Sequence, residues 1–211
     1  MIGYETEEQQ VQAIKQFWKD NGTAIILGAV IGIGGLWGWR YYNDSTIATK
    51  EAASTEFNKS IETFIDSESP ESLNAFIEAN KDSGYAPLAA LVVAQEAITN
   101  DDFEAAKAAL RQAIANDEDV SNVARIRLAN IHIELAEYTQ ALSILDEVSA
   151  DAFSAQVNEL KGDALLAQQD FDAAQTAYAA SLDDAPNNNN VKMKLDNIAY
   201  AKNKQVSTES E

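Results

Sequence analysis

The side chains that could carry out chemistry are few in this sequence, and they lack suitable neighbours. His132 is the one histidine, and the 211 residues contain no cysteine. A zinc site or a nucleophilic dyad needs further histidine, cysteine or acidic partners at fixed spacing, and none accompanies His132. The acidic clusters at 101–102 and 117–119 lack the alternating ligands and central glycine of a calcium loop. We therefore predict no enzyme activity, no metal and no cofactor, and we assign His132 to helix packing.

A second pattern with chemical potential is the glycine-rich run TAIILGAVIGIGGLWGW at residues 23–39. Gly32 and Gly34 begin the G-x-G-x-x-G spacing of a dinucleotide-binding loop, but Trp37 occupies the third glycine position. The run carries no charge, and as a helix it would measure about 26 Å, close to a hydrocarbon core of about 30 Å. Aromatic residues at both ends are typical of the headgroup region. These features predict a transmembrane helix at residues 23–42.

Small residues recur at intervals of four along the predicted span. Ala24, Gly28 and Gly32 share one helix face, and Gly34 and Gly38 repeat the spacing on another. Because small side chains let a second helix approach closely, these five residues are candidate helix-packing positions. Two interpretations remain open. The span either docks on another membrane protein or on a second copy, or it is a plain anchor in the lipid bilayer, because glycine is common in membrane helices.

The charge of the chain restricts its partners. The net charge is −19, and only three basic and four acidic residues precede residue 41. The acidic part that follows the span would repel phosphate backbones, so we predict no nucleic-acid binding. Basic residues are nearly balanced on the two sides of the span, and the positive-inside rule therefore does not decide its orientation.

The sequence beyond the span is rich in helix-forming residues and shows no sustained alternation of apolar and polar positions, which predicts an all-α domain. Residues 43–84 are expected to form leading helices in an irregular hairpin, with Pro70 at the start of the second helix. Residues 191–204 are expected to form a capping helix, and residues 205–211 a disordered tail. Residues 1–22 would be a short tail on the other side of the membrane.

Three copies of one pattern occupy residues 85–190. The aligned aromatic residues are Phe103, Tyr138 and Phe171, and the aligned alanines, 35 and 33 residues apart, are Ala106, Ala141 and Ala174. Each copy is expected to form a helix, a short polar turn and a second helix, so the copies should stack as an α-solenoid of helical hairpins. The third copy resembles the tetratricopeptide repeat. The consensus positions of that repeat are matched by five residues of this copy: Gly162, Leu165, Ala174, Tyr178 and Pro186.

Tetratricopeptide repeats present a concave surface formed by the first helix of each hairpin, and the resemblance implies which residues line it. The candidate protein-binding groove comprises Leu88, Leu91, Gln95, Ile98, Val123, Ile126, Asn130, Ile133, Gln156, Glu159, Asp163 and Leu166. Its composition is apolar toward the first copy and acidic toward the third, which suits a partner helix or an extended unfolded segment. Alternatively the leading hairpin folds into the groove, and these residues belong to the core.

The whole layout also resembles one family, through the segments EEQQVQAIKQFWKDNG, GWRYYN and LKGDALLAQQDFDAA. On these segments the chain is similar to the ancillary SecYEG translocon subunits of Gram-negative bacteria over nearly all of its length. The resemblance implies a single-pass protein of the bacterial inner membrane, with a cytoplasmic N-terminus and a periplasmic repeat domain. It also implies association with the SecYEG translocon and a membrane-anchored periplasmic chaperone. Unfolded exported polypeptides are a further partner that we expect for the groove.

From these observations we expect a membrane-anchored protein–protein interaction adaptor that assists the handling of exported proteins. An alternative from another class is a regulatory scaffold that sequesters a stress-response signalling protein through the groove or the N-terminal tail. Crosslinking from the span would distinguish them, since the adaptor predicts adducts with the translocon.

Overall fold

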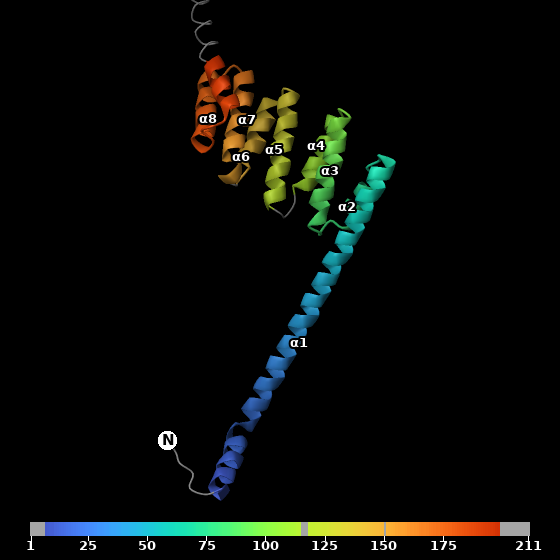
Figure 1. The fold of residues 1–211 in the computed structure, drawn as a ribbon, viewed down its shortest axis with the longest axis vertical. Helices are drawn as coiled ribbons and strands as arrows, with labels where there is room; N and C mark the ends of the chain where they lie inside the picture. The colour runs from blue at the N-terminus through green and yellow to red at the C-terminus, as the bar shows by residue number, and fades with distance from the viewer. Residues whose placement is uncertain (1–6, 115–117, 150, 199–211) are drawn as a thin grey trace, which may run out of the picture. The chain divides into compact units, whose positions relative to one another are not determined.

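The computed structural model of the chain describes residues 7–114, 118–149 and 151–198, and every regular element within those ranges is a helix (Figure 1). The expected all-α fold class is therefore confirmed. The chain divides into two compact units, Met1–Ala52 and Ala53–Glu211. The disordered tail expected at 205–211 and the end of the expected capping helix lie outside the described residues.

The first helix, α1, spans Glu7–Ser67 and is 61 residues long. It contains the glycine-rich run, and it is the one helix within the described ranges that is long and apolar enough to cross a membrane. Its large apolar side chains point outward: Ile31 is 66% exposed, Leu36 71% and Trp37 79%. A continuous apolar surface of this kind is unfavourable in water, so we expect it to face lipid.

The second unit begins within α1, whose last turns precede α2 (Glu71–Ala79). The two helices are separated by Glu68, which has a positive φ of 53°, and by Pro70, which immediately precedes α2. A left-handed residue followed by proline is a common end to a helix. The Ser72 hydroxyl then donates a hydrogen bond of 2.9 Å to the Ser60 carbonyl oxygen, which ties α2 to the end of α1.

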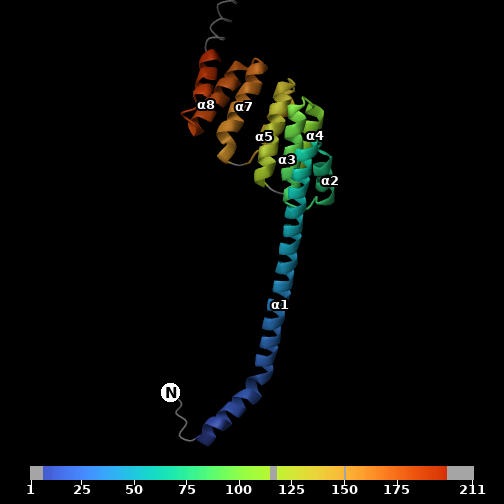
Figure 2. The same ribbon diagram turned by 45° about the vertical axis from the view of Figure 1, so that its right-hand side comes forward.

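Three hairpins follow the leading one, and each consists of two consecutive helices (Figure 2). They are α3 (Tyr85–Thr99) with α4 (Phe103–Ala113), α5 (Glu118–Glu134) with α6 (Tyr138–Asp146), and α7 (Ser154–Ala167) with α8 (Phe171–Asp184). A short 3-10 helix, η1 (Asp151–Phe153), precedes α7, and residues 189–198 form a further helix. The first helices contact one another in succession, α3 with α5 and α5 with α7.

The same chain reversal closes each of these three hairpins. Asp101, Ala136 and Gln169 stand at equivalent positions and have φ values of 57°, 58° and 65°. In the first and third hairpins an aspartate follows, and the side chains of Asp102 and Asp170 accept hydrogen bonds of 3.0 and 3.1 Å from the backbone N–H three residues ahead. This N-cap satisfies an otherwise unpaired donor, so a short polar turn is sufficient to start the second helix.

At each helix crossing, the small residue on the first helix is complementary in size to the residue that it faces on the second helix. In the third hairpin a Cβ atom added to Gly162 would lie 2.5 Å from the ring of Tyr178, which is fully buried. In the first two hairpins the equivalent pairs share a buried cluster and are Ala94 with Leu110 and Ala129 with Leu145. A leucine leaves room for the alanine methyl group, whereas the tyrosine ring requires glycine.

Candidate functional site

The helices α3, α5 and α7 form the A-helix face, on which the sequence places the candidate groove. The described side chains there fall into three groups. Leu88, Gln95, Asn130 and Gln156 are exposed; Leu91, Ile98, Val123, Ile133, Glu159, Asp163 and Leu166 are half-buried; Ile126 is buried. The side chains most open to a partner are therefore polar, with Leu88, 38% exposed, as the large apolar exception.

The half-buried apolar side chains of the A-helix face also stabilise the core. Leu91 and Ile98 pack against the first buried cluster, Ile133 packs against the second and Leu166 against the third. A side chain shared in this way between core and surface keeps only part of its area for a ligand. A partner would therefore gain less from apolar burial here than the sequence pattern indicates, and more from polar contacts.

Ile126 differs from the other groove candidates because it belongs to the core itself. Its side chain is 4% exposed and lies in the second cluster together with Leu145 of α6 and Val157 of α7. The contact between successive hairpins covers this position. Ile126 therefore contributes to stacking of the second and third hairpins and offers almost no surface to a partner.

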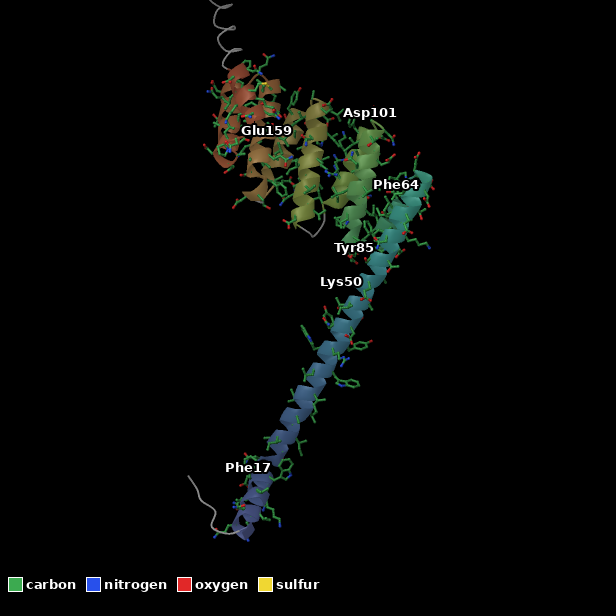
Figure 3. The ribbon with its side chains drawn as sticks, viewed as in Figure 1. Phe17, Lys50, Phe64, Tyr85, Asp101 and Glu159 are labelled. Atoms are coloured by element: carbon green, nitrogen blue, oxygen red, sulfur yellow. The ribbon has the colours of Figure 1, made fainter. Side chains whose placement is uncertain are left out.

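A lysine from the helix at 189–198 occupies the acidic end of the A-helix face. Lys194 Nζ lies 2.8 Å from Glu159 Oε1 and 2.7 Å from Asp163 Oδ1, both on α7 (Glu159 is labelled in Figure 3). The Tyr178 hydroxyl donates a hydrogen bond of 2.6 Å to Asp163, and Asn188 Nδ2 donates one of 3.1 Å to Glu159. Lys194 also stands 5.7 Å from the centre of the Tyr178 ring, within cation–π range.

This network, the Lys194 network, has clear electrostatic consequences. Burial alone lowers the pKa of Lys194, but hydrogen bonds to Asp163 and Glu159 outweigh it and raise that pKa above its ordinary value. Burial, followed by the hydrogen bond to Asp163, raises the pKa of Tyr178 far above its ordinary value. In this network a charged lysine forms ion pairs with two carboxylates, and a neutral phenol donates a hydrogen bond to one of them, which fastens the last helix to the third hairpin.

The sequence pattern did not reveal the Lys194 network, although a signal for it exists. Glu159 and Asp163 are four residues apart and so share one face of α7. Acidic side chains at that spacing repel each other unless a cation lies nearby, and the expected capping helix contains Lys192 and Lys194. Which of those two lysines faces α7 depends on how the last helix packs, and the sequence alone does not determine that packing.

A second polar network links the first hairpin to the second. The Nδ1 atom of His132, on α5, lies 2.5 Å from Glu137 Oε2, and Lys107 Nζ, on α4, lies 3.7 Å from the same oxygen. Lys107 also pairs with Glu104 at 2.6 Å, although the lysine side chain is only 7% exposed. The hydrogen bond to Glu104 raises the pKa of Lys107 against the effect of burial, and the one from His132 lowers the pKa of Glu137.

The position of His132 indicates a structural role. Its side chain is buried and joined to Glu137, so it combines packing with a hydrogen bond between successive helices. Across the described residues, no group of three histidine, cysteine, aspartate or glutamate side chains is placed to hold a metal ion. Through Lys107 and Glu137 the network links the first hairpin to the second.

The leading hairpin packs against the beginning of α3. Phe57, from the part of α1 in the second unit, stacks on Tyr85 with ring centres 5.4 Å apart and contacts Phe76 of α2 at 5.7 Å. Ile61 and Phe64 pack against the first buried cluster as well (Phe64 and Tyr85 are labelled in Figure 3). The hairpin thus shares the core of the first repeat and covers one end of the stack.

The glycines of the span have open space beside them. A Cβ atom added to Gly28, Gly32, Gly34 or Gly38 would find no atom within 4 Å, within the residues that the structure describes. These faces therefore leave room for the close approach of another helix.

Comparison with known proteins identifies relatives over most of the chain. Residues 15–200 match the model of the "Tetratricopeptide repeat-like domain" family. A protein of Escherichia coli is 34% identical over 85% of this chain and 88% of its own length, and one of Haemophilus influenzae is 32% identical over 91% and 97%. A third, from Aggregatibacter actinomycetemcomitans, is 36% identical over 85% and 90%. All three bear the name "Ancillary SecYEG translocon subunit".

A solved structure supports the fold independently. The protein titled "MamA RS-1 ArsTM double mutant" superposes with a TM-score of 0.55 and 19% identity, covering 72% of this chain and 85% of its own. At this identity the likeness extends to the helical fold alone. With the match at 15–200, the expected repeat class is confirmed, and α1 anchors the protein in a membrane. The chain belongs to the family of the ancillary SecYEG translocon subunits, which carry a tetratricopeptide repeat-like domain.

Proposed function

We propose that the protein is a non-catalytic adaptor that binds the Sec translocon through its span and a membrane-anchored chaperone or an exported polypeptide through its repeats. The names of the relatives support the translocon as partner. The observation that carries the proposal is the span itself, whose large apolar side chains are exposed and whose glycines have open space beside them. A helix with open faces for close packing is suited to dock on another membrane protein.

The topology that follows from this proposal is a cytoplasmic N-terminus and a periplasmic repeat domain in the bacterial inner membrane. Since the chain contains no cysteine, a single introduced cysteine reports on one position only. A membrane-impermeant maleimide added to spheroplasts should label Gln140→Cys, on the exposed side of α6, and should label Gln12→Cys only after lysis. The reverse labelling pattern would refute this orientation.

The docking faces of the span are tested with matched substitutions. Gly32→Leu adds a bulky side chain to the Ala24–Gly28–Gly32 face, whereas Ile31→Leu nearly preserves volume at a neighbouring lipid-facing position. Gly32→Leu should abolish copurification with the translocon in mild detergent, and Ile31→Leu should retain it. Equal recovery of the translocon with both variants would show that the span is a plain anchor.

The repeat domain is tested by crosslinking from the A-helix face. A photoreactive residue at Gln95, Asn130 or Gln156 should form adducts with a chaperone or with polypeptides during export, and one at Gln140 serves as the control. These positions are exposed on α3, α5 and α7, while Gln140 lies on α6. Adducts with a signalling protein alone would instead support the regulatory scaffold. Identical adducts from Gln140 would exclude the A-helix face as the specific surface.

A further inference from the structure

The part of α1 that precedes the span has one apolar face. Val11, Ile14, Phe17 and Trp18 recur at helical spacing, and their side chains are 50–68% exposed. Gln12 and Gln16 lie on the opposite side of the same helical turns. A helix with an apolar and a polar face of this kind needs a partner surface, because its apolar side chains gain nothing from contact with water.

The helix bends between this segment and the span (Figures 2 and 3). The bend lies close to Phe17, whose carbonyl oxygen accepts a hydrogen bond of 3.1 Å from Asn21 Nδ2. Gly22 follows, and the Trp18 ring packs over it, 3.6 Å from the position that an added Cβ atom would take. A glycine beside a side chain that bonds back to the helix is a recognised cause of helix bending.

We propose that residues 7–22 lie flat on the bilayer, with Val11, Ile14, Phe17 and Trp18 inserted among the lipid headgroups and upper acyl chains. If the segment continued straight out of the membrane, Val11 would stand about 18 Å beyond the start of the uncharged run, and the apolar face would be left in water. The bend allows the segment to turn into the membrane plane. Amphipathic helices bind lipid surfaces in this orientation.

Continuity with the span favours lipid over a protein as the occupant of this face. Trp18 precedes the uncharged run by five residues, so the segment is held at the bilayer surface and its effective concentration there is high. Phe17 and Trp18 are of the residue type that settles at the headgroup level. The polar face carries Lys19, while Asp20 follows it, so binding should depend on apolar insertion more than on anionic lipid.

The test uses the full chain in phosphatidylcholine vesicles, with one cysteine at a time carrying an environment-sensitive NBD fluorophore. Labels at Val11→Cys and Ile14→Cys should emit at shorter wavelength and be quenched by lipids brominated near the headgroup. Labels at Gln12→Cys and Gln16→Cys should emit as in water and escape that quenching. Equal emission at all four positions would overturn the proposal. Blue-shifted emission without quenching by brominated lipid would also overturn it, because a second copy of the chain would then cover the face.

A negative charge introduced on the apolar face provides an independent check. Ile14→Glu should return the emission of a label at Val11→Cys to its value in water, and the matched control Gln16→Glu should leave that emission blue-shifted. Neither substitution removes residues 23–39, so the protein stays in the vesicles in both cases. An unchanged blue shift with Ile14→Glu would contradict the proposed insertion.

Discussion

Glycine serves opposite purposes in the two units of this chain. Gly162, in the repeat domain, has the Tyr178 ring so close that an added Cβ atom would lie 2.5 Å away. Gly28 and Gly32, in the span, have no atom of the described residues within 4 Å of that position apart from the backbone of their own helix. The first glycine is required by a neighbour in the same hairpin, and the other two leave space for the close approach of another helix. Substitutions in the two units should therefore affect different measurements.

The largest expected effect is the loss of folding on placing a charge inside the repeat domain. Ile126→Glu would bury a carboxylate between α5, α6 and α7, and should cost about 4 kcal/mol or more of unfolding free energy. Circular dichroism melting of the full chain in detergent would measure the loss. Leu88→Glu, on the exposed part of the A-helix face, should leave the melting temperature nearly unchanged. A folded Ile126→Glu protein would place that residue on the surface after all.

The next effect comes from the glycine at the third helix crossing. Gly162→Ala would force the methyl group against the Tyr178 ring, and overpacking of this kind costs about 1–3 kcal/mol. The double variant Gly162→Ala with Tyr178→Leu reproduces the pair found in the first two hairpins and should recover part of the loss. Gly32→Ala is the control in the span, and it should not change the melting temperature of the domain.

A smaller effect is expected from the Lys194 network. Lys194→Met removes the cation shared by Glu159 and Asp163 and should therefore lower the unfolding free energy. The expected loss is only about 1 kcal/mol, because the three charged groups are partly solvated. Lys192→Met, on an exposed position of the same helix, serves as the control. Hydrogen exchange at residues 189–198 should accelerate in the first variant only. Equal exchange in both would show that the apolar contacts alone hold this helix.

The smallest effect is a pH dependence centred on Glu137. Because its pKa in the folded protein lies below its ordinary value, its carboxylate stabilises the folded state fully at pH values above that ordinary value. The stabilisation is lost as the pH falls through the lowered pKa. Glu137→Gln should therefore reduce stability at neutral pH and flatten its decline in acid, whereas Glu134→Gln, on an exposed residue, should not. Parallel pH profiles for the native chain and Glu137→Gln would contradict this assignment.

The sequence predicts the parts of this protein that depend on local pattern. The uncharged run at 23–39 and the aligned alanines at 106, 141 and 174 identify the span and the hairpins, because hydrophobic length and helix-crossing size are properties of short segments. The placement of Ile126 was not predictable in the same way. Its position within the repeat is a groove position by analogy, and the stacking of the next hairpin decides whether it is covered.

Long-range polar pairs were the least predictable features. Lys194 bonds to residues 31 and 35 positions earlier, and His132 shares Glu137 with a lysine from the preceding hairpin. Such contacts depend on the packing angle between hairpins, which no local pattern encodes. The composition shows an excess of acidic residues, but it does not indicate which of their carboxylates form ion pairs in the folded protein.

The helix at 189–198 determines where the array of hairpins can end. Val191 and Ile198 are buried against Tyr178 and Ala174, and Lys194 neutralises two carboxylates of the hairpin before it. A fragment that ends at Asp184 would expose the apolar side chains of Ala174 and Tyr178. The carboxylates of Glu159 and Asp163 beside them would lose their cation. We expect such a fragment to self-associate or to be degraded, so expression boundaries for the isolated domain should fall after residue 198.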